Sequence, residues 1–108
     1  MIDPMMNLLK NQLFPLGHIT STPGALVAFK EAGEYPEKYL QRHVNGDWGD
    51  LCKEDIAVNE EALKEGFRLM SAYTLGNGTK VWLVTESDRS STTFLLPFEY
   101  QMFTNLSL

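Results

Sequence analysis

The spacing of hydrophobic and polar positions changes once along the chain, from a helical period to an alternating one. Between residues 22 and 67, apolar side chains recur at helical intervals, which is typical of helices that bury one side. From residue 68 onward, short runs rich in β-branched and aromatic residues are separated by turn signals, which indicates strands. The pattern therefore predicts helices first and a β-sheet second.

Three helices are predicted in the first part, over residues 22–33, 35–46 and 52–66. Thr22 is placed to cap the first helix and Pro23 to begin it, while glycines at 33, 46 and 66 are placed to end the three. The side chains expected to be buried are Ala25, Leu26, Phe29 and Ala32 in the first helix, Tyr39, Leu40 and Val44 in the second, and Ile56, Leu63 and Phe67 along the third.

Strands are predicted on both sides of this helical region. Residues 14–22 read as a short strand that Pro15 and Gly17 place at a sheet edge. Residues 68–75 and 80–87 flank a hairpin turn at Asn77-Gly78, and a two-residue turn there sets Tyr73 opposite Trp82. A third strand follows over residues 91–97. We therefore expect apolar side chains on both faces of the sheet.

These elements predict an α+β fold with a short N-terminal strand, three helices and a three-stranded antiparallel β-meander, with the helices in a single layer on the sheet. Residues 14–100 are expected to form one domain, after a flexible leader at residues 1–13. The tail, residues 101–108, is apolar enough to dock on the domain or to mediate self-association.

Composition narrows the classes of function. The chain has 108 residues, of which 44% are hydrophobic, and a net charge of −5, with scattered Lys and Arg, so a nucleic-acid-binding role is disfavoured. An acidic surface suits a partner with a basic one. Cys52 is the single cysteine, which fits a reducing cytoplasm and excludes an intrachain disulfide. No signal peptide and no apolar run of about 20 residues is present, so a cytoplasmic protein without membrane contact is expected.

Five segments between Phe14 and Tyr100 occur in the order PLGHITSTPGAL, HVNGDWGDL, NEEALKEGFRLMSAYTL, GTKVWLVTESDRSSTTFLLP and EY. In order and spacing they resemble a family of small bacterial proteins that are carried on plasmids and other mobile elements. The resemblance implies a habitat and no established activity. Cys52 and Phe98 depart from the family pattern, which has acidic or polar residues at the first position and polar ones at the second.

Some members of that family carry the label of a type I restriction enzyme's modification subunit. A DNA methyltransferase needs a Rossmann-type domain larger than this chain, with a glycine-rich cofactor turn and an Asn-Pro-Pro-aromatic motif. Neither motif occurs here, so the label is not supported as an activity, and no cofactor is expected.

The stretch RHVNGDWGDL, residues 42–51, contains most of the residues that could bind a metal ion or take part in catalysis. His43, Asp47 and Asp50, joined by Glu86, could bind a cation in a small metal-dependent hydrolase or nuclease. The alternative reading is structural: Gly46 ends a helix, an aspartate caps backbone donors, Trp48 anchors the turn and Gly49 allows a tight bend. Because no metal motif has this spacing, we favour the structural reading.

The turn TESDRS, residues 85–90, offers Asp88 and Arg89 as recognition residues, with Trp48 as a third interaction candidate. The alternative, which we favour, is a turn that Ser87 and Asp88 stabilise while Arg89 forms a salt bridge to the helix layer. Asn77 and Gly78 are assigned structural roles in the hairpin. We expect a non-catalytic cytoplasmic interaction module from a mobile element that modulates a DNA defence or restriction system; the metal-dependent enzyme is the alternative and a nucleic-acid binder the weaker one.

Overall fold

The structure, a computed structural model described over residues 12–100, has the predicted α+β class. Its elements in chain order are β1 (His18–Ser21), α2 (Pro23–Ala32), α3 (Glu37–Val44), α4 (Lys53–Glu65), β2 (Leu69–Thr74), β3 (Lys80–Thr85), β4 (Ser91–Leu95) and the short 3-10 helix η1 (Pro97–Glu99). The predicted tail, and residues 1–11 of the predicted leader, lie outside the described residues.

The sheet has four strands in the order β1-β4-β3-β2 and is mixed, which corrects the predicted three-stranded antiparallel meander. Strands β2, β3 and β4 form the expected antiparallel part. Strand β1 adds to it in parallel, with His18 opposite Ser91 and Ser21 opposite Phe94. Local patterning could not reveal this pairing, because the partners lie far apart in sequence. The predicted position of β1 at an edge is confirmed.

The hairpin between β2 and β3 turns at Asn77 and Gly78, but with a register one residue away from the prediction. Tyr73 pairs with Val81, and Ala72 with Trp82. The loop has an extra residue because the Gly78 amide donates to the Leu75 carbonyl and Gly78 adopts a φ of 90°, a turn followed by a glycine bulge. A shift by one residue moves Trp82 to the opposite face from Tyr73.

The predicted helix ends are confirmed. The Thr22 hydroxyl accepts a hydrogen bond from the Ala25 amide at the start of α2. After α3, Gly46 has a φ of 84°, and the amides of Gly46 and Asp47 donate back to the carbonyls of His43 and Arg42. Gly66 ends α4 with a φ of 78°.

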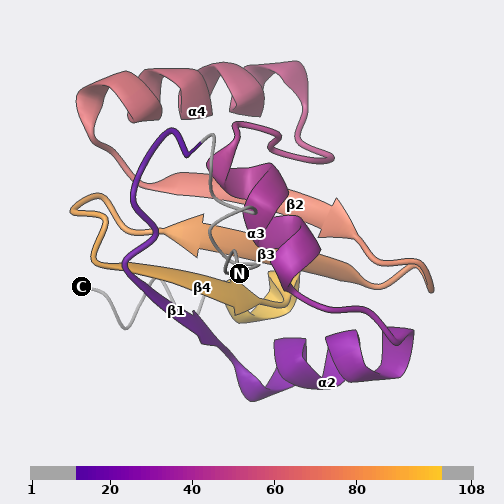
Figure 1. The fold of residues 1–108 in the computed structure, drawn as a ribbon. Helices are drawn as coiled ribbons and strands as arrows, with labels where there is room; N and C mark the ends of the chain where they lie inside the picture. The colour runs from indigo at the N-terminus through magenta and orange to yellow at the C-terminus, as the bar shows by residue number, and fades with distance from the viewer. Residues whose placement is uncertain (1–11, 101–108) are drawn as a thin grey trace, which may run out of the picture.

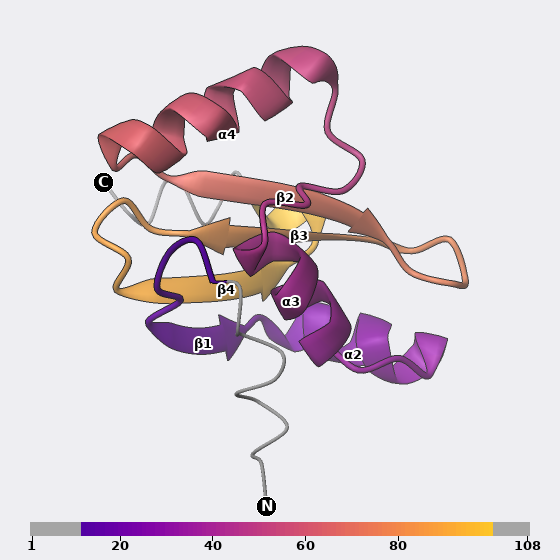
Figure 2. The same ribbon diagram turned by 45° about the horizontal axis from the view of Figure 1, so that its top comes forward.

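The helices do not form the single layer that we predicted. Helix α3 crosses one face of the sheet, α4 runs along the outer side of β2, and α2 follows the C-terminal end of β1 (Figures 1 and 2). In this position, the Asn59 side chain of α4 bonds to the outer backbone of β2 at Met70. In the part of the chain that the structure describes, no helix is both long and apolar enough to cross a membrane.

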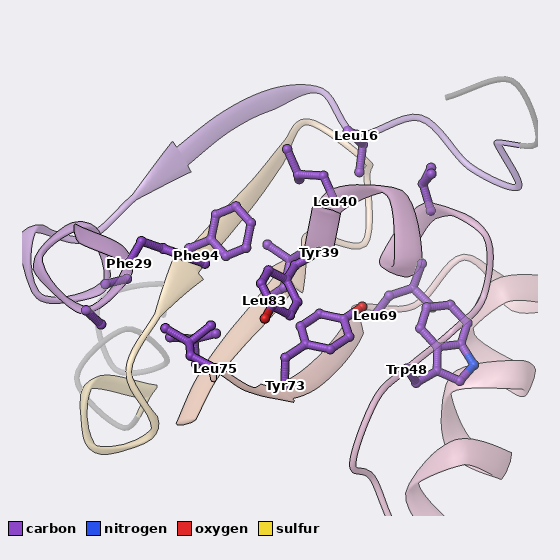
Figure 3. Close-up of a cluster of buried hydrophobic side chains, with 14 of the residues drawn as sticks. Leu16, Phe29, Tyr39, Leu40, Trp48, Leu69, Tyr73, Leu75, Leu83 and Phe94 are labelled. Atoms are coloured by element: carbon purple, nitrogen blue, oxygen red, sulfur yellow. The ribbon is translucent and has the colours of Figure 1, made fainter. Parts of the chain in front are cut away.

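The main core lies between α3 and the sheet, where Tyr39, Leu40, Tyr73, Leu83 and Phe94 meet (Figure 3). The opposite face is covered in part, since Val84 and Leu95 on it are also buried.

Two side chains expected in the core are exposed. Leu26 is 54% exposed because α2 packs through Ala25, Ala28 and Phe29 instead. Phe67 is 57% exposed because it follows the Gly66 cap, which turns the chain away from the helical face.

Candidate functional site

His43 lies at the centre of a buried chain of polar side chains. Its Nδ1 atom is 2.6 Å from the Ser71 hydroxyl, and its Nε2 atom is 2.9 Å from the Thr85 hydroxyl. The Thr85 hydroxyl is 2.8 Å from that of Thr92, which donates to the Leu16 carbonyl at 2.7 Å. These hydrogen-bonded side chains link α3, three strands and the segment before β1. They therefore hold these elements in one arrangement.

The direction of every proton in this chain follows from its last member. A carbonyl can only accept, so Thr92 donates its hydroxyl proton to Leu16. Thr92 must then accept from Thr85, and Thr85 must accept from His43. The Nε2 atom of His43 therefore carries a proton. Because burial keeps the ring neutral, Nδ1 carries no proton and accepts from Ser71, which assigns the Nε2–H tautomer.

The surroundings of His43 also favour the neutral ring. Its exposed fraction is 0%, and the rings of Phe14 and Trp48 stand edge-on to it at 5.2 Å and 5.6 Å between centroids. Burial, together with a smaller contribution from the charge of Arg89, lowers the pKa of His43 to about 3. A ring that stays neutral and enclosed holds the core together and is not accessible to a substrate.

Asp47 serves the turn after α3. Its Oδ2 atom accepts from Arg42 Nε at 2.8 Å, and its Oδ1 atom accepts from the Gly49 amide at 3.1 Å. The Arg42 hydrogen bond holds the pKa of the Asp47 carboxyl below its usual value. Its backbone carbonyl also accepts from the Tyr73 hydroxyl. Asp47 therefore joins α3, the following turn and β2.

The other two carboxylates of the alternative reading, a metal site, have separate partners. Asp50 accepts from the Thr74 hydroxyl at 2.7 Å, and Glu86 accepts from Arg68 at 3.0 Å. Among residues 12–100, no group of three or more His, Cys, Asp and Glu side chains is placed to hold a metal ion. The structure thus does not bring His43, Asp47, Asp50 and Glu86 together as ligands of one cation.

Trp48 and Gly49 lie against β2. The Trp48 indole is 3% exposed and stacks on Phe14, in keeping with the anchoring role that we predicted. A Cβ atom on Gly49 would lie 1.9 Å from the Ala72 carbonyl oxygen, so the backbone here passes closer than any side chain allows. The interaction role of Trp48 stays a prediction, and it would require this ring to leave its packed position.

Arg89 connects the β3–β4 turn to the end of α4. It has a φ of 60°, and its guanidinium donates to the carbonyls of Phe67 at 2.6 Å and Ala62 at 3.2 Å. A cation suits this position because helix carbonyls at a C-terminus carry negative partial charge. The neighbouring Asp88 is exposed and accepts from the Ser90 amide at 3.0 Å. Arg89 thus contacts the helix layer through carbonyls, whereas we had expected an ion pair.

The outer backbone groups of β2 are paired at Met70 and Ala72. The Asn59 amide donates to the Met70 carbonyl and accepts from the Met70 amide, as a neighbouring strand would. Two residues on, Ala72 donates to Trp48 and accepts from Asp50 through backbone atoms. Thr74 then bonds to the Asp50 carboxylate. The stretch 47–50 and α4 therefore close this edge to other strands.

The outer edge of β1 is different, since within the described residues β4 is the one strand that pairs with β1. Beside it lies a cavity of about 440 Å³, which we call the edge groove. It is lined by Ile19 and Ser21 of β1, Leu26 of α2, Pro36 and Leu40 at α3, and Phe94 of β4, with Glu37 at its side. Figure 3 shows Phe94 and Leu40 beside β1.

Sequence reasoning missed Ser71, Thr85 and Thr92, as well as Asn59. A signal for the first three was present. Ser71, Thr85 and Thr92 stand at inward positions of strands whose neighbours at alternate positions are apolar, and His43 stands within the apolar stripe of α3. Polar residues at core positions of several elements predict hydrogen bonds among them. The edge groove had no such signal, because Leu26 was assigned to the core.

Comparisons of the chain with protein-family models, with curated proteins and with solved structures found no match.

Proposed function

We propose that the protein is a non-catalytic interaction module that binds another protein at the edge groove. The observation that carries the proposal is the uncovered apolar surface at this corner. Ile19 and Leu26 are 44% and 54% exposed, and they flank a cavity whose floor is formed by the buried side chains of Leu40 and Phe94. Exposed apolar side chains that surround a cavity are typical of a binding surface.

The surface charge supports a basic partner. The chain carries a net charge of −5, and Glu37 stands at the side of the edge groove in the first turn of α3. Complementary charge raises the rate at which partners meet and disfavours acidic competitors. Through the resemblance to mobile-element proteins, we place the module in the cytoplasm and take a component of a DNA defence or restriction system as the partner.

A photo-crosslinking amino acid placed at Leu26 tests the proposal in cells that hold the native partner. The matched control is the same amino acid at Val58, an apolar residue of α4 that is 64% exposed and lies outside the edge groove. We expect a discrete crosslinked protein from position 26 and none from position 58.

The crosslinked protein is then purified and its affinity measured against Leu26→Asp and Val58→Asp variants. We expect the first variant to weaken binding by about tenfold or more, because a charge is placed against an apolar contact, and the second to leave it unchanged. Crosslinking of equal yield at both positions, or equal affinity of the two folded variants, would show that the edge groove is not the binding surface.

A further inference from the structure

The two edges of the sheet differ in how far their outer backbone groups are covered, and this difference suggests how a partner binds. At β2, the Asn59 side chain of α4 and backbone groups of residues 48 and 50 occupy the outer hydrogen-bonding positions of Met70 and Ala72. At β1, the strand is exposed, and it contains none of the lysine, proline or bulge features that usually protect an edge. An edge left open beside an apolar groove is an arrangement that accepts an added strand.

The register identifies the backbone groups that are available. The amides of His18 and Thr22 donate to the Ser90 and Phe94 carbonyls of the β4 side, at 2.9 Å each. Successive residues of a strand direct their backbone groups to alternate sides. The N–H and C=O groups of Ile19 and Ser21 therefore face away from β4, toward the open edge.

We propose that the partner enters as an extended segment that pairs with the outer edge of β1, and that its alternate residues are apolar and basic. This inference rests on the proposed function. The backbone groups of Ile19 and Ser21 bind the main chain of the segment, and the edge groove between Leu26 and Phe94 takes apolar side chains from one of its faces. Glu37 attracts its basic residues.

A second copy of this chain is a weaker occupant on grounds of charge. Pairing of β1 with β1 across a two-fold axis would bring together two protomers that each carry a net charge of −5, with a Glu37 beside each groove. Like charges at an interface oppose association. A basic segment gains from the same charges.

The test uses the full chain, labelled with ¹⁵N, and the acetylated, amidated hexapeptide Lys-Val-Lys-Val-Lys-Val. We expect saturable shifts of groove residues and slower hydrogen exchange at the amides of Ile19 and Ser21, with no change at Thr20, whose backbone groups face β4. The Glu-Val counterpart of the peptide should bind at least about tenfold more weakly, because its carboxylates meet an acidic surface.

Two N-methylated peptides provide a matched pair. One peptide carries a methyl group on the backbone nitrogen of each valine, and the other carries one on the backbone nitrogen of each lysine. The two peptides therefore have equal composition. Since alternate amides of a strand point the same way, only one of the two peptides can still pair with β1 in the direction that the unmethylated peptide takes. Loss of binding by one and retention by the other supports the inference, whereas equal binding overturns it.

Three further outcomes would also overturn it. In the first, Leu26→Asp weakens binding of the peptide or the native partner, but the amides of Ile19 and Ser21 still exchange freely in the complex. This result would contradict strand addition, whereas the proposed function would stand. Protection of these amides that rises with protein concentration without peptide would identify a second copy as the occupant. Protection that is lost when residues 1–11 are deleted would identify that segment of the same chain.

Discussion

The hydroxyl of Thr92 donates a hydrogen bond of 2.7 Å to the carbonyl oxygen of Leu16, and this contact orients the whole buried chain that leads to His43. Each earlier member donates its hydrogen bond in the same direction: Ser71 donates to His43, His43 to Thr85, and Thr85 to Thr92. A residue that looked like candidate chemistry is therefore a connector between α3 and three strands.

Replacing His43 by alanine should lower the free energy of unfolding by about 2–4 kcal/mol, since the change leaves a cavity and unpaired hydroxyl groups at Ser71 and Thr85. His18→Ala on the exposed face of β1 is the control and should cost less than about 0.5 kcal/mol. Urea unfolding followed by circular dichroism measures both. Similar values for the two variants would contradict the stabilising role of the buried ring.

Stability should fall as the pH is lowered from 6.5 toward 5. The folded protein keeps His43 neutral because its pKa is lowered to about 3, whereas the unfolded chain has the ordinary value of 6.5 and takes up a proton. Because the unfolded state binds more protons, stability rises with pH, by about 1.4 kcal/mol per unit once the unfolded His43 is fully charged.

The lowered pKa values of the Asp47, Asp88, Glu34 and Glu54 carboxyls give the same sign of dependence at lower pH, near and below their ordinary values of 3.8 for Asp and 4.5 for Glu. The range from pH 5 to 6.5 therefore reports on His43. Unfolding curves of the wild type and of His43→Gln across that range measure the effect, and we expect the variant to have the flatter profile. Parallel profiles would be inconsistent with a neutral buried ring.

Arg89→Asn should loosen the end of α4. Asparagine adopts positive φ readily, so the backbone of the turn is kept while the bonds to the carbonyls of Phe67 and Ala62 are lost. We expect a loss of about 1–3 kcal/mol in the free energy of unfolding and faster hydrogen exchange in the last turn of α4. Asp88→Asn, which retains the oxygen that accepts from Ser90, should have little effect on either.

Alanine at Gly49 should be much more damaging than alanine at Gly33. Both glycines have positive φ, at 76° and 67°, so both substitutions carry the same backbone cost of about 1 kcal/mol. Only at Gly49 would the new Cβ meet another atom, the Ala72 carbonyl oxygen; nothing lies within 4 Å at Gly33. A difference in unfolding free energy of less than about 1 kcal/mol between the two variants would rule out the close approach to β2.

Asn59→Ala should uncover the edge of β2. The variant loses both hydrogen bonds to the Met70 backbone, which we expect to cost about 1–3 kcal/mol. Because an unpaired strand edge invites pairing with another chain, self-association should also increase. Glu60→Ala, an exposed neighbour on α4, is the control. Denaturation and sedimentation measurements separate the two effects, and a monomeric, fully stable variant would count against the role of Asn59.

Sequence periodicity predicted the helices and strands well because the signals were local. Thr22, Gly46 and Gly66 cap helices as expected, and Asn77 and Gly78 form the hairpin turn. Register was less accessible, since one additional residue in that turn reversed the relative faces of Tyr73 and Trp82. The parallel pairing of β1 with β4 depends on contacts between distant residues, which periodicity does not encode.

The sequence shows which residues could form a metal site, but it does not show how their side chains are arranged in space. His43, Asp47 and Asp50 are close in sequence, yet one is buried among hydroxyl groups and the other two bond to Arg42 and Thr74. Helix α3 ends between them, so the side chains before and after Gly46 point to different neighbours. Proximity in sequence therefore gave a cluster that folding separates.

The parallel pairing of β1 has a consequence for the order in which the molecule forms. Thr20 and Thr93, whose hydroxyls are 2.7 Å apart, are separated by 73 positions in the chain. As the protein emerges from the ribosome, α2 and α3 can form long before β4 exists. Strand β1 must therefore wait, unpaired on both sides, for almost the entire chain to be synthesised, and loop closure makes its docking a late step.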